Sequence, residues 1–499
     1  MMRPFPRIPH DACRGRRAAA LAAVLLVVLV QSGCATYTTK FKDLRPQFAG
    51  GQYDAALATV EKEAGSKDRV LYYLERGLIL HYAGRFAESN EAFAAAERTA
   101  DDLYTRSISE GALSLISNDN AISYRPRPFE MAMVPYYKGL NYTYLGQREE
   151  AQVEARRASL QLSKYVDATL DGLRAEDRDA LERIRNNAFL HYYSGMVYDW
   201  DGELNDAFVA YRNAAVAYQQ SHGLLQTEVP PQLGRDLTRV GARLGFRAEL
   251  DQLRASCPDV FRDVDDDGHP VTREDYEKLA AWRGGEGEVV LMLETGFVPE
   301  KTQVRFDFPV FESEAYDDPN YWSWQIWAGM GNTQAFVKGR KVEYWVSVAA
   351  PELQDGRPGP VAAARVSAGT AAGHAVSHRV ENLSRQARLT FDAEKPTIFF
   401  KTILRGLTKY LASRGAEKAG GDWAKLAANI FGAVTESADT RSWLTLPEHL
   451  HLVRLSLPPG TYDLQVELLG YDGRPLHTET IAGVAVDAGD WTFVSRRVF

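Results

Sequence analysis

The chain has 499 residues, of which 45% are apolar, 25% charged and 11% aromatic. These fractions are close to the average of folded globular proteins, so they exclude a wholly disordered chain, a collagen-like repeat and a polytopic membrane protein. The length is enough for about two to four domains.

The first 33 residues have the pattern of a signal peptide. An arginine-rich stretch, residues 14–17, precedes an apolar run over residues 18–30 that is too short to span a bilayer. The run ends in Gln31-Ser32-Gly33-Cys34, which resembles the bacterial lipobox, with Gln31 where Leu is usual. The resemblance implies cleavage before Cys34 and acylation of Cys34. An ordinary signal peptide with an incidental cysteine is the alternative.

Several acyl chains on Cys34 would anchor the protein stably, since one chain alone binds a membrane only marginally. The next residue is Ala35 rather than Asp. The resemblance to lipoproteins therefore implies localisation at the outer membrane, on its periplasmic face. Cys257 is then the one other cysteine of the mature chain, since Cys13 leaves with the leader, and we expect it to be a buried small hydrophobe.

The charge argues against nucleic acid as a partner. The formal net charge is −8, and removal of the leader takes away five Arg and one Asp and leaves −12. An acidic surface repels phosphates, and no basic stretch stands out.

From Tyr37 to about Leu250 apolar residues recur at helical spacing, and small residues recur on one frame. A glycine in a helix lets a neighbouring helix approach closely, and a glycine in a turn accepts positive φ. The pattern predicts helix–turn–helix hairpins. The helix glycines are Gly77, Gly139 and Gly195, the turn glycines are Gly84, Gly146 and Gly202, and the small residues five positions after each turn are Ser89, Ala151 and Ala207.

These hairpins resemble the tetratricopeptide repeat. They start 62 and 56 residues apart, where that repeat expects about 34, so extra segments lie between them. A generic helical bundle is the alternative. A solenoid of this kind offers a surface for holding a peptide or a protein and supplies no chemistry by itself.

Two segments of the array are candidates for partner contact. One is an extended loop with Pro126 and Pro128, which we expect to project into the concave face. The other is a charged face on the outgoing helix of the second hairpin, for which a solvated or intramolecular salt-bridge face is the alternative. The candidate residues are Tyr124, Arg125, Arg127, Phe129, Glu130, Glu154 and Arg157.

After Pro230-Pro231 we expect one more helix to about Ser256, followed by an acidic run over residues 263–274. The run fits the twelve-residue calcium loop, in which alternate carboxylates converge on a hard cation. Its candidate ligands are Asp263, Asp265, Asp267 and Glu274. Pro270 stands where paired loops place an aliphatic residue, and a solvated acidic turn is the alternative. Apart from this structural calcium, the sequence predicts no cofactor.

The second half is predicted to be β-rich. Short alternating or apolar runs from Val289 onward indicate antiparallel strands in a sandwich of the immunoglobulin-like kind. A helical insertion is expected over about 383–436, packed across one sheet. The predicted fold class is α+β multidomain, with a TPR-like α-solenoid before a β-sandwich-like domain. The predicted parts are 1–33 signal peptide, 34–48 lipidated terminus and tether, 49–256 helical repeats, 257–286 acidic linker and 287–499 β-rich domain.

Aromatic residues cluster at Tyr321, Trp322, Trp324 and Trp327, close after Tyr316. Exposed, they would stack on cell-wall sugars; core or interface packing is the alternative. His449 and His451 share a strand face without a third metal ligand. No catalytic motif is found among the zinc-protease, serine-hydrolase and nucleotide-binding patterns.

Several short motifs resemble an uncharacterised family of Gram-negative lipoproteins with a tetratricopeptide-like N-terminal half. They are Phe129-Glu130-Met131, Leu140-Asn141-Tyr142, Leu145-Gly146, Val153-Glu154-Ala155-Arg156-Arg157, Gly296-Phe297-Val298-Pro299, Ala438-Asp439-Thr440-Arg441-Ser442-Trp443 and Leu446-Pro447. The resemblance implies no enzyme activity and no established ligand. Relatives are associated with chromosomal proximity to lipoprotein activators of peptidoglycan synthases, which implies a cell-envelope partner.

The sequence therefore predicts an outer-membrane lipoprotein that acts as a non-catalytic interaction scaffold for a periplasmic protein. A glycan-binding lipoprotein is the alternative, through the tryptophan cluster. An envelope hydrolase is a distant third, since any 66 acidic residues include pairs that a fold brings together.

Overall fold

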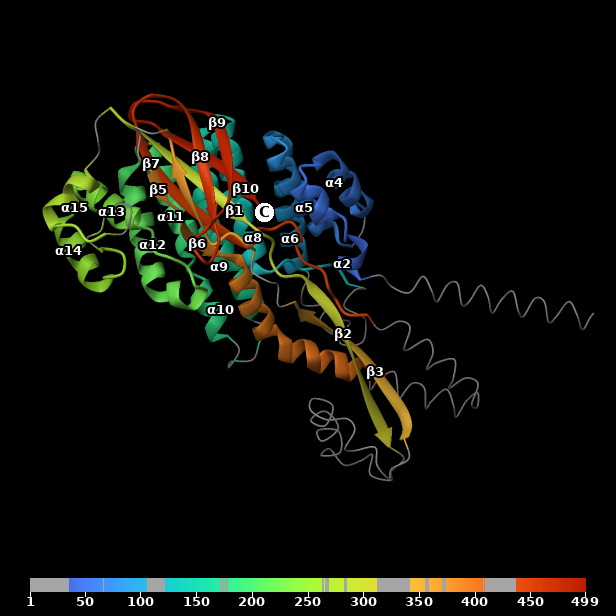
Figure 1. Ribbon diagram of the computed structural model, residues 1–499. Coiled ribbons are helices and arrows are strands. Elements are labelled where there is room, and N and C mark those ends of the chain that lie inside the picture. The colour runs from blue at the N-terminus through green and yellow to red at the C-terminus, as the bar shows by residue number, and fades with distance from the viewer. Residues whose placement is uncertain are drawn as a thin grey trace, which may run out of the picture.

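The computed structural model describes residues 36–65, 67–105, 122–170, 173, 175, 178–262, 264, 269–281, 285–311, 342–354, 359–369, 374–406, 408 and 437–499. In these residues the chain is mixed helix and sheet with several antiparallel sheets, as the predicted α+β class requires. Figure 1 shows helices arranged along the strands, from α4 at one end to α14 and α15 at the other.

Within the described residues the helical half contains three long helix pairs. They are α5 (Arg69–Tyr82) with α6 (Phe86–Thr105), α8 (Pro128–Tyr144) with α9 (Arg148–Leu170), and α11 (Ala188–Trp200) with α12 (Leu204–Leu225). Each pair packs on the next, through α6 against α8 and α9 against α11. The short helices are α2 (Tyr37–Lys40), α3 (Leu44–Ala49), α4 (Tyr53–Val60), η1 (Glu61–Glu63) and α10 (Asp179–Ile184).

The helix glycines lie where a neighbouring ring leaves no room for a side chain. A Cβ on Gly77 would lie 2.6 Å from the Phe93 ring, and a Cβ on Gly195 2.3 Å from the Tyr211 ring, in both cases the second helix of the same pair. Gly139 differs, because its Cβ would meet the Tyr193 hydroxyl at 2.5 Å, on the next pair. The helix glycines therefore allow close packing of helices both within a pair and between neighbouring pairs.

The turn glycines all adopt positive φ, at 72° for Gly84, 72° for Gly146 and 85° for Gly202. Each of these turns closes in the same way. The residue after the glycine donates its N–H to the carbonyl five residues back, as Arg85 does to Leu80 at 2.9 Å. Ala151 and Ala207 are fully buried at the start of the second helices, and the Ser89 hydroxyl donates to the Gly77 carbonyl at 2.7 Å.

The end of the array differs from the single helix expected after Pro230. Gly245, at φ 77°, divides the segment into α13 (Pro231–Leu244) and α14 (Arg247–Ser256). Residues assigned to the acidic linker also fold onto the array. α15 (Arg273–Ala280) packs on α13, and Tyr276 and Cys257 are buried there.

Most of the segment expected to be a tether, residues 34–48, is folded, with α2 beginning at Tyr37. Tyr37, Phe41, Leu44 and Phe48 are buried and belong to the core of the helical half. The Arg45 guanidinium donates to the carbonyls of Leu444 and Val298, so α3 also contacts the C-terminal half. Residues 37–48, which were expected to belong to a tether, are therefore part of the folded body.

Two four-stranded sheets and a two-stranded ribbon make up the described strands. The first sheet has the order β10-β1-β7-β6, with β1 (Gly287–Thr295), β6 (His378–Asn382), β7 (His449–Leu457) and β10 (Trp491–Val498). The second has the order β5-β4-β8-β9, with β4 (Ala363–Ser367), β5 (His374–Val376), β8 (Gly460–Leu469) and β9 (Pro475–Val486). β1 and β10 run parallel, which differs from the antiparallel pairing expected throughout.

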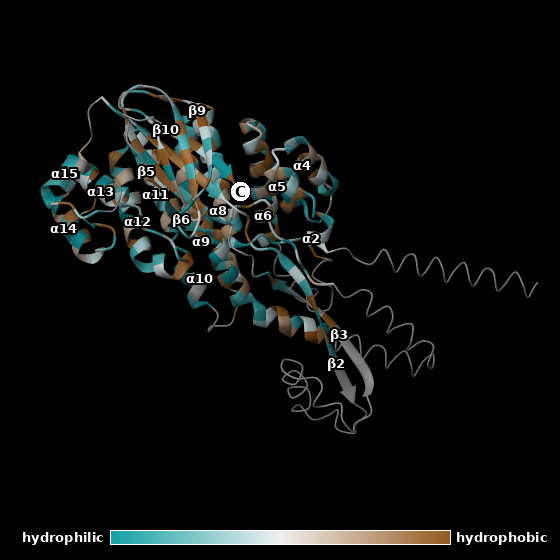
Figure 2. Cartoon of the chain, viewed as in Figure 1, coloured by the Kyte–Doolittle hydropathy of each residue, from teal (hydrophilic) through white to brown (hydrophobic). Residues whose placement is uncertain are grey.

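The first sheet is buried on both faces, and we call it the central sheet. Successive residues of a strand point to opposite faces, so Val289, Leu291 and Leu293 pack on the second sheet. Val290 and Met292 join the core of the helices instead. Figure 2 shows apolar residues concentrated in these inner strands.

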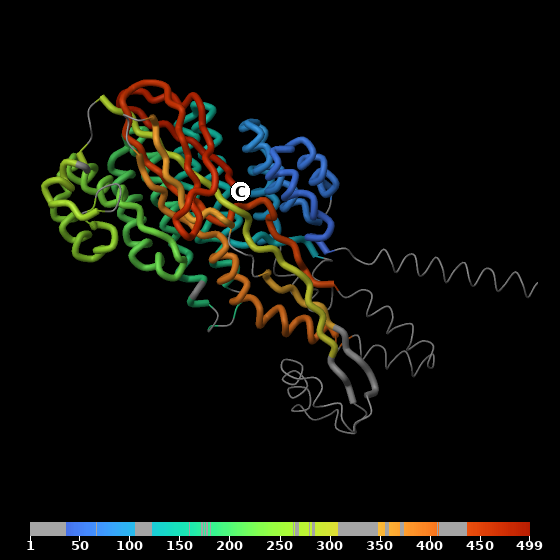
Figure 3. The backbone as a smooth tube through the Cα atoms, in the orientation of Figure 1, coloured from blue at the N-terminus to red at the C-terminus, as the bar shows by residue number. Residues whose placement is uncertain are grey.

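The remaining elements connect the array to the ribbon of β2 (Lys301–Phe311) and β3 (Val342–Leu353). A helix over residues 383–406 follows β6 and runs toward the ribbon (Figure 3). Leu383 and Ala387 pack into the helical core, and the Phe399 ring lies 5.6 Å from the Phe306 ring of β2. This helix therefore bridges the array and the ribbon rather than crossing a sandwich sheet.

We expect Gly195→Ala to lower the free energy of unfolding by about 1–3 kcal/mol, because the added methyl overlaps the Tyr211 ring. Gly223→Ala is the matched control, since a Cβ there has open space in the same helix pair. It should be neutral or gain up to about 1 kcal/mol from helix propensity. Urea denaturation measures both, and equal effects would contradict the close-approach account.

Candidate functional site

Residues 437–448 of the same chain, which we call the clasp segment, pack against α5, α6 and α8 of the helical array. Between residues 437 and 443 this segment has neither helix nor strand. Trp443 is fully buried, with its ring 6.0 Å from that of Phe93 and 6.2 Å from that of Tyr137. The helices α6 and α8 thus bury the side chain of an irregular segment of the same chain.

Glu75 of α5 fixes the backbone after Trp443. Its carboxylate accepts the Leu444 N–H at 2.5 Å, the Thr445 N–H at 3.3 Å and the Thr445 hydroxyl. Burial raises the pKa of Glu75 to about 7, although these hydrogen bonds and Arg45 act in the opposite direction. The sequence signal for Glu75 was a carboxylate, next to Arg76, within an otherwise apolar stretch of α5, and it was missed.

Glu130 of α8 holds the other side of Trp443. One carboxylate oxygen accepts the Trp443 N–H at 2.8 Å, and the other accepts the Tyr124 hydroxyl at 2.7 Å and the Arg127 N–H at 2.6 Å. Arg441 of the clasp segment lies over the Tyr124 ring and pairs with Asp68 at 2.6 Å. The loop before α8 therefore contacts the clasp segment of its own chain.

Two further carboxylates join the array to the central sheet. Glu294 of β1 accepts the hydroxyls of Tyr82 at 2.5 Å, Tyr136 at 3.1 Å and Tyr137 at 2.7 Å. Arg497 of β10 lies 3.5 Å from the same carboxylate.

Asp236 of α13 pairs with Arg454 of β7 at 2.8 Å and accepts the Tyr192 hydroxyl at 2.9 Å. Burial alone would raise the pKa of Asp236, but Arg454 and Arg239 lower it. Glu75, Glu130, Glu294 and Asp236 are each at most 4% exposed. The four carboxylates thus hold the array and the β strands together, and none presents an accessible oxygen to a substrate.

The predicted partner-binding residues are mostly covered. Tyr124, Phe129 and Glu130 are 1–5% exposed, and Arg127 pairs with Glu394 of the helix over residues 383–406 at 2.8 Å. Arg125 is half-buried in the same loop. As a surface for a second protein this loop is closed, because the clasp segment occupies it.

Glu154 and Arg157 form part of an intramolecular network, which is the alternative that the sequence left open. Buried Lys138 pairs with Glu154 at 2.6 Å and with Glu97 at 3.0 Å. Arg157 pairs with Glu97 at 3.2 Å and with Glu154 at 3.1 Å. These charges neutralise one another between α6, α8 and α9.

Several predicted site residues lie outside the described residues. They are Cys34, the calcium candidates Asp263, Asp265 and Asp267, and the cluster Tyr321, Trp322, Trp324 and Trp327. Glu274 is described, and it is an exposed residue of α15 that pairs with Lys278 at 3.0 Å. In the part of the chain that the structure describes, no three His, Cys, Asp or Glu side chains are grouped to hold a metal ion.

His449 and His451 do share a face of β7, with ring centroids 6.2 Å apart. Burial lowers the pKa of His449 to about 3 and of His451 to about 4. Both imidazoles are therefore neutral at neutral pH.

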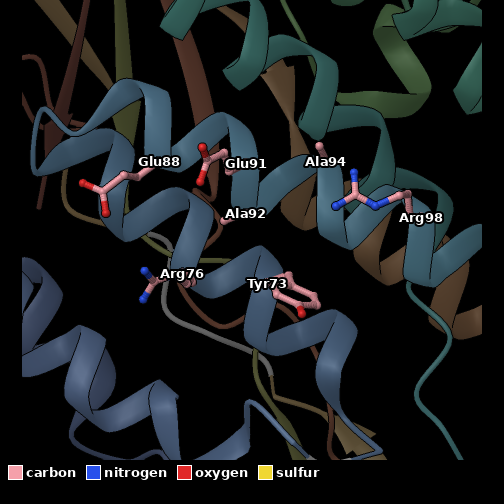
Figure 4. Close-up of a pocket in the computed structure, with 7 residues that line it drawn as sticks. All are labelled: Tyr73, Arg76, Glu88, Glu91, Ala92, Ala94 and Arg98. Atoms are coloured by element: carbon pink, nitrogen blue, oxygen red, sulfur yellow. The ribbon is translucent and has the colours of Figure 1, made fainter.

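A pocket of about 470 Å³ opens between α5 and α6, on the first helix pair (Figure 4). Tyr73 and Arg76 come from α5, and the other lining residues, Glu88, Glu91, Ala92, Ala94 and Arg98, come from α6. Glu91 and Arg98 are exposed, and among the described residues neither is paired with an opposite charge. The pocket is thus an open, mixed-charge depression, which sequence periodicity alone does not reveal.

Neither a scan against protein-family models nor a search of curated proteins finds a match to this chain. No described helix combines the length and the hydropathy that crossing a bilayer requires.

We expect Trp443→Ala to lower the free energy of unfolding by about 3–5 kcal/mol, because it leaves a cavity beside Phe93 and Tyr137 where the buried indole lies. Trp443→Phe should cost less, since the indole N–H has no hydrogen-bond partner in the described structure. Urea denaturation and hydrogen exchange in α5 and α8 measure the effect. If Trp443→Ala left exchange in both helices unchanged, the clasp segment would not be held as described.

Glu75 predicts a specific pH dependence. Its pKa is raised in the folded state to about 7 from the ordinary 4.5, so its contribution to stability is full below pH 4.5 and is lost as pH rises to 7. The loss is about 3 kcal/mol from the size of the shift. In Glu75→Gln this part of the pH slope should disappear, whereas the exposed control Glu249→Gln should keep it. Identical slopes in all three proteins, measured by denaturation between pH 4.5 and 7, would refute the assignment.

Proposed function

We propose that this protein is a non-catalytic scaffold of the periplasm, anchored by acyl chains on Cys34 to the outer membrane. In this proposal the helical half is a TPR-like solenoid, and its partner is a periplasmic protein of the cell envelope. The lipobox-like sequence and the family resemblance support the anchor and the compartment.

The observation that carries the scaffold proposal is that the clasp segment is buried against α5, α6 and α8. Trp443 and the backbone of the clasp segment take the place that a bound peptide has in a solenoid groove. A foreign peptide would have to displace a fully buried indole and three backbone hydrogen bonds to carboxylates, which costs several kcal/mol. A partner therefore binds elsewhere on the array.

The pocket between α5 and α6 is the surface that fits this requirement. It is open and lies on α5 and α6, two helices that also contact the clasp segment. Arg98 and Arg76 offer guanidinium groups to carboxylates, and Glu91 and Glu88 offer carboxylates to amines. Tyr73 adds an aromatic face. A polypeptide segment that carries both signs of charge matches this lining.

The test is site-specific photo-crosslinking in intact envelopes. A photoreactive residue in place of Glu91 should give a discrete adduct with one periplasmic protein, identified by mass spectrometry. Adding Arg98→Glu should reduce that adduct about tenfold, since it removes the free guanidinium and introduces repulsion.

The matched control is Arg212→Glu, which makes the same charge change at an exposed residue of α12 and should leave the adduct intact. Loss of the adduct with Arg212→Glu as well, or an adduct that is unaffected by Arg98→Glu, would contradict a partner site at this pocket.

A further inference from the structure

The folded body begins very close to the predicted acylation site. Tyr37 is 9% exposed and packs in the core, three residues after Cys34. A trans peptide chain spans at most about 3.6 Å per residue, so the α-carbon of Cys34 lies within about 11 Å of that of Tyr37. Only Ala35 and Thr36 lie between the proposed anchor and Tyr37.

The start of the chain is fixed by contacts on several sides. The Thr38 N–H donates to the Thr440 hydroxyl of the clasp segment at 3.4 Å, and Lys40 pairs with Glu63 of η1. Burial and the nearby carboxylates of Glu75, Asp68 and Glu63 raise the pKa of Tyr37 well above its usual value. α2, η1 and the residues just before α5 therefore meet around Tyr37.

These same segments carry a group of exposed basic side chains, which we call the basic end. Its members are Lys40, Lys42, Lys62, Lys67 and Arg69. Lys40 is paired with Glu63, but in the described structure none of the other four has an acidic partner. Exposed carboxylates are fewer here: Glu63 and Asp68 are buried, and the exposed ones are Asp43, next to Lys42, and Glu61, which contacts Arg76 and Tyr72. The chain as a whole is acidic, with a net charge of −8.

We propose that the basic end lies directly against the bilayer and contacts anionic lipid headgroups, so that the acyl anchor fixes the orientation of the whole body. This inference rests on the proposed acylation of Cys34. Lys and Arg side chains near an anionic bilayer are attracted within a Debye length, and an acyl anchor combined with a basic patch is a two-signal attachment. α14 and α15, at the other end of the array in Figure 1, then point away from the membrane.

The experiment measures how close two labelled positions come to the lipid surface. The acylated full chain, with Cys257→Ser, carries a fluorophore at Lys42→Cys or, as the distant control, at Glu249→Cys of α14. Each protein is reconstituted in vesicles of phosphatidylethanolamine and phosphatidylglycerol that contain a lipid with a spin-labelled headgroup, which quenches at short range. Quenching at position 42 should exceed that at position 249 about fivefold.

Two variants test the cause. A Gly-Ser linker of about 20 residues between Ala35 and Thr36 allows the body to move roughly 25 Å away, so quenching at position 42 should fall to the distant value while the attached fraction is unchanged. Lys62→Glu with Lys67→Glu should weaken quenching at position 42, and Arg243→Glu with Arg247→Glu at the distant end should not. Vesicles of phosphatidylcholine alone should reduce the effect of the first pair.

Equal quenching at both positions, or no response to the linker, overturns the orientation while the anchor stands. If the mass of the N-terminal peptide shows no acylation and the protein does not attach to vesicles, the proposed anchor fails, and this inference fails with it.

Discussion

The constraint on which the rest of the structure depends is that the central sheet is buried on both faces. Val289 and Leu291 of β1 need the second sheet, and Val290 and Met292 between them need the helices. Neither half of the chain can bury this sheet alone, because removing either partner exposes a full apolar face to water. The central sheet therefore lies between two hydrophobic clusters in the described structure, one shared with the helical array and one shared with the second sheet.

Buried carboxylates decide how the two halves fit. An apolar face tolerates sliding, but a carboxylate taken from water must find donors at defined positions. Glu75 finds them on the clasp segment, and Glu294 finds three tyrosine hydroxyls on the array. The titrations of a buried carboxylate and of a buried histidine change the stability of the fold in opposite directions. Burial raises the pKa of Glu75, which favours stability at lower pH, and lowers that of His451, which favours stability at higher pH. The two contributions therefore offset each other between about pH 4.5 and 6.5.

Local features of this fold could be predicted from sequence, and long-range features could not. The turn glycines, such as Gly84, predict positive φ because few other residues adopt it, and the structure confirms the positive φ at these positions. The helix glycines indicate that a neighbouring helix packs closely, but they do not indicate that Gly139 faces Tyr193 of the next pair. The continuous apolar run of β1 was compatible with burial on both faces, yet its parallel pairing with β10 depends on residues 200 positions later. Tyr124 and Glu130 were singled out for partner contact. The Trp443 N–H donates to Glu130, and Arg441 lies over the Tyr124 ring; nothing local to the loop encodes contacts at that separation.

The shared core also fixes the proposed partner site relative to the proposed anchor. Tyr37 and Phe48, at the start of the chain, belong to the same core as α5 and α6, whose outer surfaces form the pocket. Arg69 of the basic end opens α5, and Tyr73 of the pocket follows one turn later. A partner held between α5 and α6 would therefore sit close to the membrane surface, at a height set by the fold rather than by a linker. Since a short connection between anchor and body leaves little further entropy to lose on binding, such an arrangement favours partners that are themselves attached to the same membrane.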